Sequence, residues 1–167
     1  VFSKEVDLFE RPYLHKALGS SAYDSEGVAT RNQHFVHEGV LERYMLNSYS
    51  ARQLNMKTTA NAGGLHNCFM TAGDLSFPEL LAKMDTGLLV TELSGQGVNL
   101  INGDYSRGAF GYWVEKGKVQ YSVSGITIAG NLREMFLNLV AISHDLDRTG
   151  NIQVGSMLIE EMTVAGS

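Results

Sequence analysis

The amino-acid sequence predicts an α+β fold, in which a twisted, mostly antiparallel and barrel-like β-sheet carries two or three packed helices. Glycine accounts for 18 of the 167 residues and proline for only 2, a balance that favours a turn-rich β protein over a disordered linker. Residues 119–123 alternate apolar and polar side chains, as a half-exposed strand does. Residues 132–140 instead carry one apolar stripe at helical spacing. We therefore expect about seven to ten short strands beside the helices.

Length and charge limit the classes of protein that the chain can belong to. Residues 1–167 are enough for one domain, and no apolar run approaches the roughly 18 residues that cross a bilayer, so we expect a soluble protein without a membrane partner. The chain has 13 basic and 18 acidic residues, a net charge of -5, and its basic residues are scattered. This pattern argues against binding to nucleic acid, which needs clustered Lys and Arg.

The single cysteine, Cys68, allows no internal disulfide, which favours a cytoplasmic location. We interpret Cys68 as a small buried residue between Asn67 and Phe69. A reactive thiol is the alternative.

The first seventy residues contain weak but readable signals for secondary structure. Turn residues, apolar runs and Pro12 divide this part into five expected elements: a short helix over 12–18, a turn at 24–27, a hairpin over 32–46, a helix over 50–56 and a strand over 63–70. The hairpin turns at Glu38-Gly39.

Two histidines in the hairpin, His34 and His37, raise the question of a metal site, because Glu38 follows His37 as in the first half of a zinc-protease helix. No second histidine follows at the spacing that a metallopeptidase uses. Positions three apart in a regular strand also point to opposite faces of the sheet. We therefore expect no metal ligand in this chain.

The stretch from Gly87 to Trp113 is the part around which the rest is organised. A buried strand over 88–93 is expected first, followed by Gly95-Gln96-Gly97, where alternating glycines indicate a bulge or a close approach of another backbone. A second strand is expected from Val98, and Asn102-Gly103 then turns the chain. The result is a meander with a glycine-lined edge.

This glycine-lined edge has two interpretations. The glycines can serve only turns and sheet curvature, or the bare backbone can receive an extended peptide as an added strand. Polar residues nearby are candidates for catalysis but are equally well explained as solvated turn residues: Glu92, Asp104 and Arg107. We assign no catalytic residue. The substrate-binding candidates are Gly95, Gln96, Gly97, Val98, His66 and Asn67.

The second half of the chain carries stronger signals. Ser76-Phe77-Pro78-Glu79 predicts a helix start with a capping box, and Asn131 predicts the cap of a helix that runs to His144. His144 would then meet the carbonyl end of that helix. The remaining expected features are a turn at Lys116-Gly117, a bulge at Ser124-Gly125, and two closing strands over 152–154 and 158–164.

Several runs of sequence resemble the C-terminal part of the TldD/PmbA family, on the PmbA (TldE) side. The most specific are VTELSGQGVN and NGDYSRGAFGYWVE, and DSEGVAT (Asp24–Thr30), LNSYSARQLNMKTTANAGG (Leu46–Gly64) and ITIAGNLREMF (Ile126–Phe136) extend the resemblance over nearly the whole chain. Family members are much longer. The resemblance therefore implies a fragment, residues 1–167, of a C-terminal domain without its N-terminal domain.

The resemblance implies a cytoplasmic, heterodimeric zinc metalloprotease that processes or degrades unfolded peptides, including microcin leader peptides and an antitoxin. In that pair the TldD-like subunit carries an HExxxH helix and a C-terminal cysteine as zinc ligands. This sequence has no HExxxH, and residues 151–155 hold no cysteine. The resemblance therefore implies an accessory subunit, with zinc in the TldD-like partner and none in this chain. The older family description, modulator of DNA gyrase, then reflects an indirect route through peptide processing.

Two alternatives stay open. The chain can be a peptide-binding or regulatory module that acts without proteolysis. A homodimer of the isolated chain is also conceivable, because truncation would leave sheet edges exposed.

Overall fold

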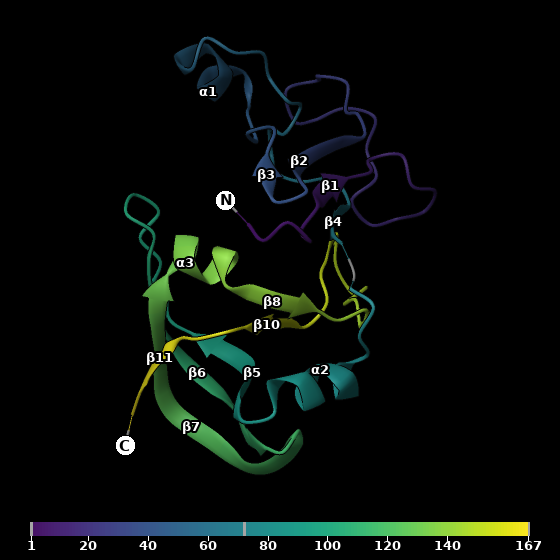
Figure 1. Ribbon diagram of the computed structural model, residues 1–167. Helices are drawn as coiled ribbons and strands as arrows, with labels where there is room; N and C mark the ends of the chain where they lie inside the picture. Colours follow the sequence, from purple (N-terminus) through teal and green to yellow (C-terminus); the bar gives the residue numbers. More distant parts are fainter. Residues whose placement is uncertain (1, 72, 167) are drawn as a thin grey trace. The chain divides into compact units, whose positions relative to one another are not determined.

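A computed structural model describes residues 2–71 and 73–166 of the chain (Figure 1). In these residues the α+β prediction is confirmed, with three helices: α1 (Ser48–Gln53), α2 (Phe77–Met84) and α3 (Leu132–Leu137). The strands are β1 (Leu8–Glu10), β2 (Gln33–His37), β3 (Val40–Leu41), β4 (Cys68–Met70), β5 (Gly87–Ser94), β6 (Asp104–Glu115), β7 (Lys118–Asn131), β8 (Leu139–Ile142), β9 (Ile152–Gln153), β10 (Met157–Ile159) and β11 (Thr163–Ala165).

The described residues form two compact units, whereas the sequence predicted one continuous domain. Unit 1 contains residues 2–3, 73–144 and 156–166, and unit 2 contains residues 4–71 and 145–155. The strands form a five-stranded sheet, a four-stranded sheet and a two-stranded ladder, and the described part of the chain contains no closed barrel.

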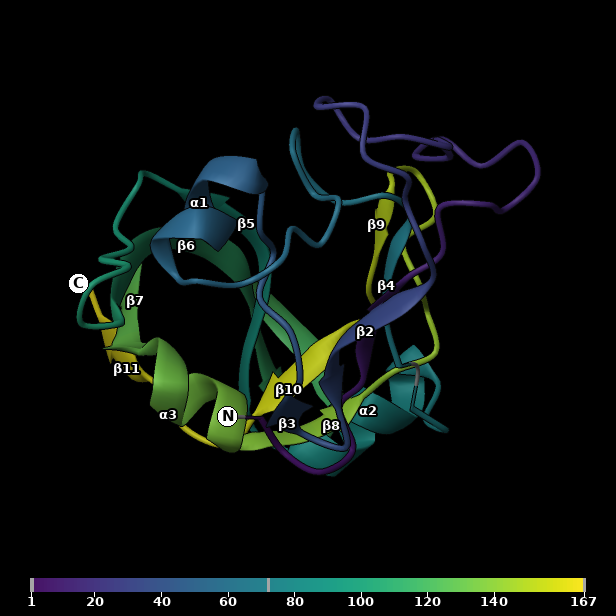
Figure 2. The ribbon, with the colours of Figure 1, turned by 90° about the horizontal axis from the view of Figure 1, so that it is seen from above.

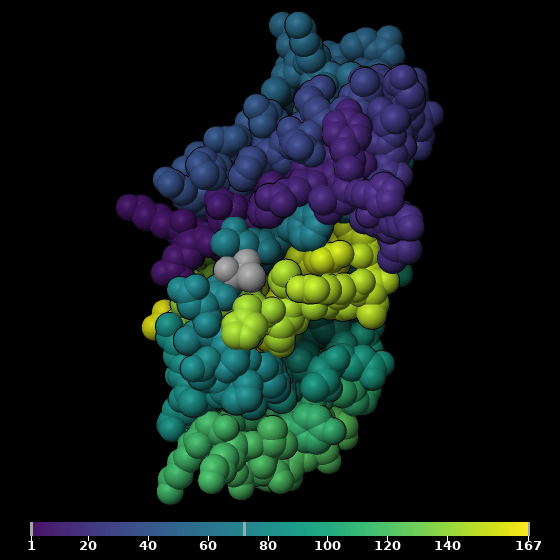
Figure 3. All heavy atoms as spheres, turned by 90° about the vertical axis from the view of Figure 1, so that its right-hand side faces the viewer, coloured from purple at the N-terminus to yellow at the C-terminus, as the bar shows by residue number. Residues whose placement is uncertain are grey.

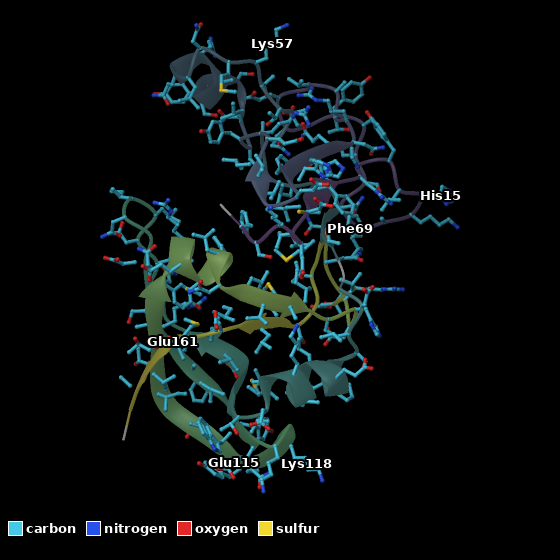
Figure 4. The ribbon with its side chains drawn as sticks, in the orientation of Figure 1. His15, Lys57, Phe69, Glu115, Lys118 and Glu161 are labelled. Atoms are coloured by element: carbon cyan, nitrogen blue, oxygen red, sulfur yellow. The ribbon has the colours of Figure 1, made fainter. Side chains whose placement is uncertain are left out.

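Unit 1 is built on the long hairpin of β6 and β7. Its four-stranded sheet has the order β11-β7-β6-β5, is antiparallel throughout, and curves strongly (Figure 2). The hairpin turns at Lys116-Gly117, both with positive φ, so that Glu115 pairs with Lys118 at its tip (Figure 4). This hairpin forms the green end of the surface in Figure 3. The turn predicted at Lys116-Gly117 is confirmed.

The core of unit 1 is apolar and lies against this sheet. Its buried members are Tyr105, Ala109, Ile126 and Ile128, with Leu88, Val90, Val123, Leu132, Met135 and Met162 packed around them. The register of β6 against β7 shifts where Ala109 pairs with Ile126 and Gly111 with Val123. The predicted bulge at Ser124-Gly125 is therefore confirmed, and it lets Val123 and Ile126 serve the same core.

Unit 2 contains the five-stranded sheet in the order β3-β2-β1-β4-β9. The neighbours are antiparallel except β4 and β9, which run parallel and lie side by side in Figure 2. The predicted hairpin at Glu38-Gly39 is confirmed, with a return strand of only two residues. Cys68 is buried as expected, and burial, followed by the charge of Glu10, raises the pKa of its thiol to about 11.

Both predicted helix starts in the second half of the chain are confirmed. The backbone N–H of Ser76 donates to the Glu79 carboxylate at 2.8 Å, and Pro78 occupies the first turn of α2. The Asn131 side chain accepts from the backbone N–H of Arg133 at 3.1 Å and starts α3. Within the described ranges, no helix is long and apolar enough to cross a membrane.

Three predicted helices are wrong in whole or in part. Residues 12–18 form a series of turns in place of a helix, and the predicted 50–56 helix lies at Ser48–Gln53. The helix after Asn131 ends at Leu137, because Leu139–Ile142 pairs with β10 as a strand. His144 therefore caps no helix, and its backbone N–H donates to the Leu75 carbonyl at 2.9 Å. The C-terminal segment forms three strands where two were predicted.

Candidate functional site

The glycine-lined edge is a place of close backbone contact, as its sequence predicts. After β5, the chain from Gly95 turns back alongside β6, so that the Gly97 carbonyl accepts from the Ser106 N–H at 2.7 Å. Val98 forms an isolated antiparallel bridge with Tyr105. A Cβ atom at Gly97 would lie 1.5 Å from the Ser106 carbonyl oxygen. Position 97 therefore has no room for any side chain.

The strand predicted from Val98 is reduced to that single bridge. The chain turns before Gly103, whose φ is +82° and whose N–H donates to the Asn99 carbonyl at 2.8 Å. At the turn, Leu100 is 87% and Ile101 is 98% exposed. Large apolar side chains that stand this far out of a fold have no role in its own core.

The backbone beside this loop has an unpaired side. In the described residues β5 is the last strand of its sheet and has β6 as its one neighbour. Its outer N–H and C=O groups can therefore pair with an added strand. Gln96 is exposed, Val98 is 39% exposed, and both lie at the end of this edge.

The three polar residues near the edge do not form a common cluster. Asp104 is engaged locally, accepting from the Asn102 amide at 2.6 Å. Arg107 donates to the Ser94 carbonyl at 3.5 Å, and Glu92 is exposed on β5. Among the described residues, no hydrogen bond or ion pair links any two of these three side chains, which suits the interpretation as solvated polar residues.

His66 and Asn67 lie in unit 2 and so belong to a different unit from Gly95–Val98. Asn67 is 1% exposed and ties the chain together: its Oδ1 accepts from the Gly19 N–H at 2.8 Å, and its Nδ2 donates to the Arg11 carbonyl and to Ser20. Its polar atoms are therefore already paired. His66 lines a shallow hollow with Gly63 and Gly64.

A buried polar cluster behind His66 was missed by the sequence analysis. Glu10 is 1% exposed and accepts hydrogen bonds from the side chains of Gln33 at 2.6 Å and Asn61 at 3.1 Å, and from the backbone N–H of His66 at 3.0 Å. The Nδ1 atom of His66 lies 3.8 Å from Glu10, buried and without a hydrogen-bond partner. These residues are far apart in sequence, so no local motif announces them.

The expectation that His34 and His37 point to opposite faces is wrong. Their ring centroids lie 5.2 Å apart, and Asp7 joins them in a group whose ligand atoms are all within 4.8 Å of one another. The cause is a β-bulge in β2.

The fold and site together define a class: an α+β domain with a curved antiparallel meander and a glycine-lined, unpaired sheet edge. The chain belongs to the family described as PmbA/TldA metallopeptidase C-terminal domain, whose model matches residues 1–166. The match spans both compact units, so both are parts of the one family domain.

Similar proteins bear the names PmbA and TldD. A metalloprotease PmbA homologue of Buchnera aphidicola is 52% identical over 167 residues, which cover all of this chain and 37% of that protein. A metalloprotease TldD homologue of Haemophilus influenzae is 28% identical over 179 residues, covering 92% of this chain and 37% of its own length. The chain thus spans little more than a third of the length of these relatives.

A solved structure from Bacteroides thetaiotaomicron, described as a modulator of DNA gyrase, has the same fold with a TM-score of 0.93 and 30% identity. The similarity covers 100% of this chain and 38% of that one.

Proposed function

We propose that this chain is part of the accessory, PmbA-like subunit of a two-subunit metallopeptidase that processes or degrades unfolded peptides. The observation that carries the proposal is the difference in similarity: 52% identity to a PmbA homologue against 28% to a TldD homologue, within a family named for metallopeptidases. In this proposal the TldD-like subunit supplies the zinc ion and its ligands. This chain supplies binding surface and no catalytic residue.

The sequence supports the division of roles. Its 167 residues contain no HExxxH pair, and Asn151–Gly155 contains no cysteine. In the proposal, the groups that cleave the peptide bond come from the partner. The cytoplasm is the proposed location, because the one cysteine is a buried thiol without a disulfide partner.

The unpaired side of β5 and the loop Gly95–Val98 are the proposed peptide-binding surface. An extended, unfolded peptide offers alternating N–H and C=O groups that match those of an edge strand, so recognition would not depend strongly on its sequence. Leu100 and Ile101, which stand out from the loop, are the proposed apolar contact with the peptide or the partner. His66 stays a candidate for peptide binding in unit 2. Asn67 would contribute by holding the surrounding backbone in place through its hydrogen bonds.

The net charge of -5 supports peptide over nucleic acid as the binding partner. A gyrase-related effect, of the kind in the description of the Bacteroides structure, would then arise indirectly through the processing of a peptide.

The alternative is a peptide-binding module that acts without proteolysis. It explains the unpaired edge of β5 equally well, and the two proposals differ in what they require from a partner. A binding module captures peptide alone, whereas an accessory subunit leads to cleavage only in the presence of a TldD-like protein.

A reconstitution experiment tests the proposal. A fluorescent unfolded peptide is incubated with a full-length PmbA-like protein that contains this chain, with a TldD-like subunit, and with both. Cleavage is expected only in the mixture, and Gly97→Val should lower it about tenfold or more because the new side chain collides with Ser106. Leu18→Ser, at an exposed position of unit 2, is the matched control that should cleave normally. Cleavage by the PmbA-like protein alone would contradict the proposal, and peptide binding without cleavage in the mixture would favour the alternative.

A further inference from the structure

Three side chains with metal-binding atoms converge on one side of unit 2, where β1 meets β2. The Asp7 carboxylate lies 2.9 Å from Nδ1 of His37, and the His34 ring meets the His37 ring edge-on with 5.2 Å between centroids. One ligand atom from each residue lies within 4.8 Å of the other two. This is the one such group of three among residues 2–71 and 73–166.

A β-bulge at Phe35 brings the two histidines together. Leu8 pairs with Val36 and Phe9 with His34, so Phe35 is the extra residue of β2 and has no partner on β1. As a consequence Phe35 and Val36 are both buried, at 1% exposure each. The residues on either side, His34 and His37, therefore both face the solvent side of the sheet. A regular strand would have separated them.

Aromatic packing holds the His34 ring in place. His34 packs on the Phe9 ring with centroids 5.3 Å apart, and Phe9 in turn stacks on Phe69 at 5.6 Å. Phe69, labelled in Figure 4, belongs to the neighbouring strand β4. The aromatic column limits the positions that the His34 ring can take.

Asp7 is also held in place by two hydrogen bonds. Its backbone N–H donates to the Thr71 hydroxyl at 3.1 Å, and its carboxylate accepts from the Glu38 N–H at 2.7 Å. Positive φ at Glu38 directs that N–H toward the carboxylate.

We propose that Asp7, His34 and His37 form a binding site for a divalent transition-metal ion, with Zn²⁺ as the best-fitting ion. Two imidazole nitrogens and one carboxylate are a donor set that suits Zn²⁺, whereas Ca²⁺ and Mg²⁺ prefer oxygen ligands only. Ligand atoms around tetrahedral Zn²⁺ lie about 3.3 Å apart, given bonds of about 2.0–2.1 Å. The side chains of His37 and Asp7 are 49% and 28% exposed, so they have room to rotate until their ligand atoms reach this spacing.

Such an ion would tie the β2–β3 hairpin to β1. The site is separate from the proposed peptidase function, because two residues of β2 and one residue just before β1 form it without the partner subunit or a peptide. Water would complete the coordination on the exposed side.

Calorimetric titration of the chelator-treated, 167-residue chain with Zn²⁺ at neutral pH tests the site. We expect one Zn²⁺ per chain, and a loss of affinity of about tenfold or more in His34→Ala and in His37→Ala. His15→Ala is the matched control: His15 is exposed on a loop away from β1 and β2 (Figure 4), and its loss should leave Zn²⁺ affinity unchanged. The melting temperature should rise with Zn²⁺ in the unchanged chain and in His15→Ala only.

Circular dichroism of the metal-free variants checks that each is folded, and His34→Asn and His37→Asn replace any alanine variant that is not. The proposal is overturned if the chain binds no Zn²⁺, if binding survives both substitutions, or if His15→Ala weakens it equally.

Discussion

Both units bury apolar side chains, but their interiors differ in the number of buried polar side chains. Unit 1 encloses an apolar cluster of Tyr105, Ala109, Ile126 and Ile128. Unit 2 also buries polar side chains, and these hydrogen-bond to side chains or backbone groups far away in the sequence: Glu10, Gln33, Thr59, Asn61 and Asn67. The two units are of similar size in residues, so the contrast reflects the kind of secondary structure that each contains.

The contrast shows two ways in which a folded unit can satisfy the backbone groups of its interior. The strands of unit 1 are up to 14 residues long and pair with one another along the sheet, apart from the outer side of β5, so apolar side chains suffice to fill the interior. The strands of unit 2 have two to five residues, and long loops run between them. Loop backbone needs side-chain partners when it is buried. Glu10 and Asn67 supply such partners, and we expect the two interiors to respond differently to substitution.

Removal of the Glu10 side chain should have the largest effect. Glu10→Ala leaves the buried donors of Gln33, Asn61 and His66 without their acceptor, and should lower the free energy of unfolding by about 4 kcal/mol. Urea denaturation followed by circular dichroism measures the loss. Glu161→Ala, at an exposed position labelled in Figure 4, is the control and should change stability by less than about 0.5 kcal/mol. Equal losses in the two variants would contradict the polar account of unit 2.

A smaller loss is expected from a cavity in unit 1. Ile126→Ala removes buried apolar volume next to Tyr105 and Ile128, and should lower the free energy of unfolding by about 3 kcal/mol. Ile101→Ala removes the same atoms at a position that is 98% exposed, and should be neutral to within about 0.5 kcal/mol. Hydrogen exchange sharpens the comparison: Ile126→Ala should lower protection in β6 and β7, and Glu10→Ala in β1 and β4. The reverse pattern would mean that the two interiors are not independent.

The smallest effect concerns the response of unit 2 to acid. Burial tends to raise the pKa of Asp24, but hydrogen bonds from the backbone N–H groups of Val28, Ala62 and Glu26 lower it below 3.8. A lowered pKa in the folded state stabilises the protein above about pH 4, and this contribution is lost as the pH falls through the lowered value. Asp24→Asn should therefore reduce the loss of stability between about pH 4 and pH 2.

Denaturation midpoints measured across this pH range give the slope for each variant. Ile126→Ala changes no ionisable group and should keep the original slope. A slope unchanged in Asp24→Asn would show that the three hydrogen bonds do not favour the charged carboxylate.

The sequence predicted best where a short signal suffices. The caps at Ser76 and Asn131 and the turn at Lys116-Gly117 depend on backbone geometry within a few residues, and each is present as predicted. The bulge at Ser124-Gly125 follows from a change in the parity of apolar residues. The close backbone contact at Gly97 was predicted from its spacing to Gly95.

Predictions failed where a distant segment decides the local structure. Leu139–Ile142 continues a helical stripe, but pairing with β10 makes it a strand. The bulge at Phe35 has no local sign, because it arises from the register between β1 and β2, and the convergence of Asp7, His34 and His37 was missed for this reason. The Glu10 cluster was missed likewise, since its other members lie 23 to 56 positions from Glu10.

Strand β9 has a consequence for the order in which the two units can fold. Residues 145–155 leave unit 1 to join unit 2, and the chain then returns to unit 1 to supply β10 and β11. Neither unit is therefore one continuous segment of the sequence. During translation, unit 2 cannot add β9 until Gln153 has emerged from the ribosome. By then most of unit 1 has already been synthesised.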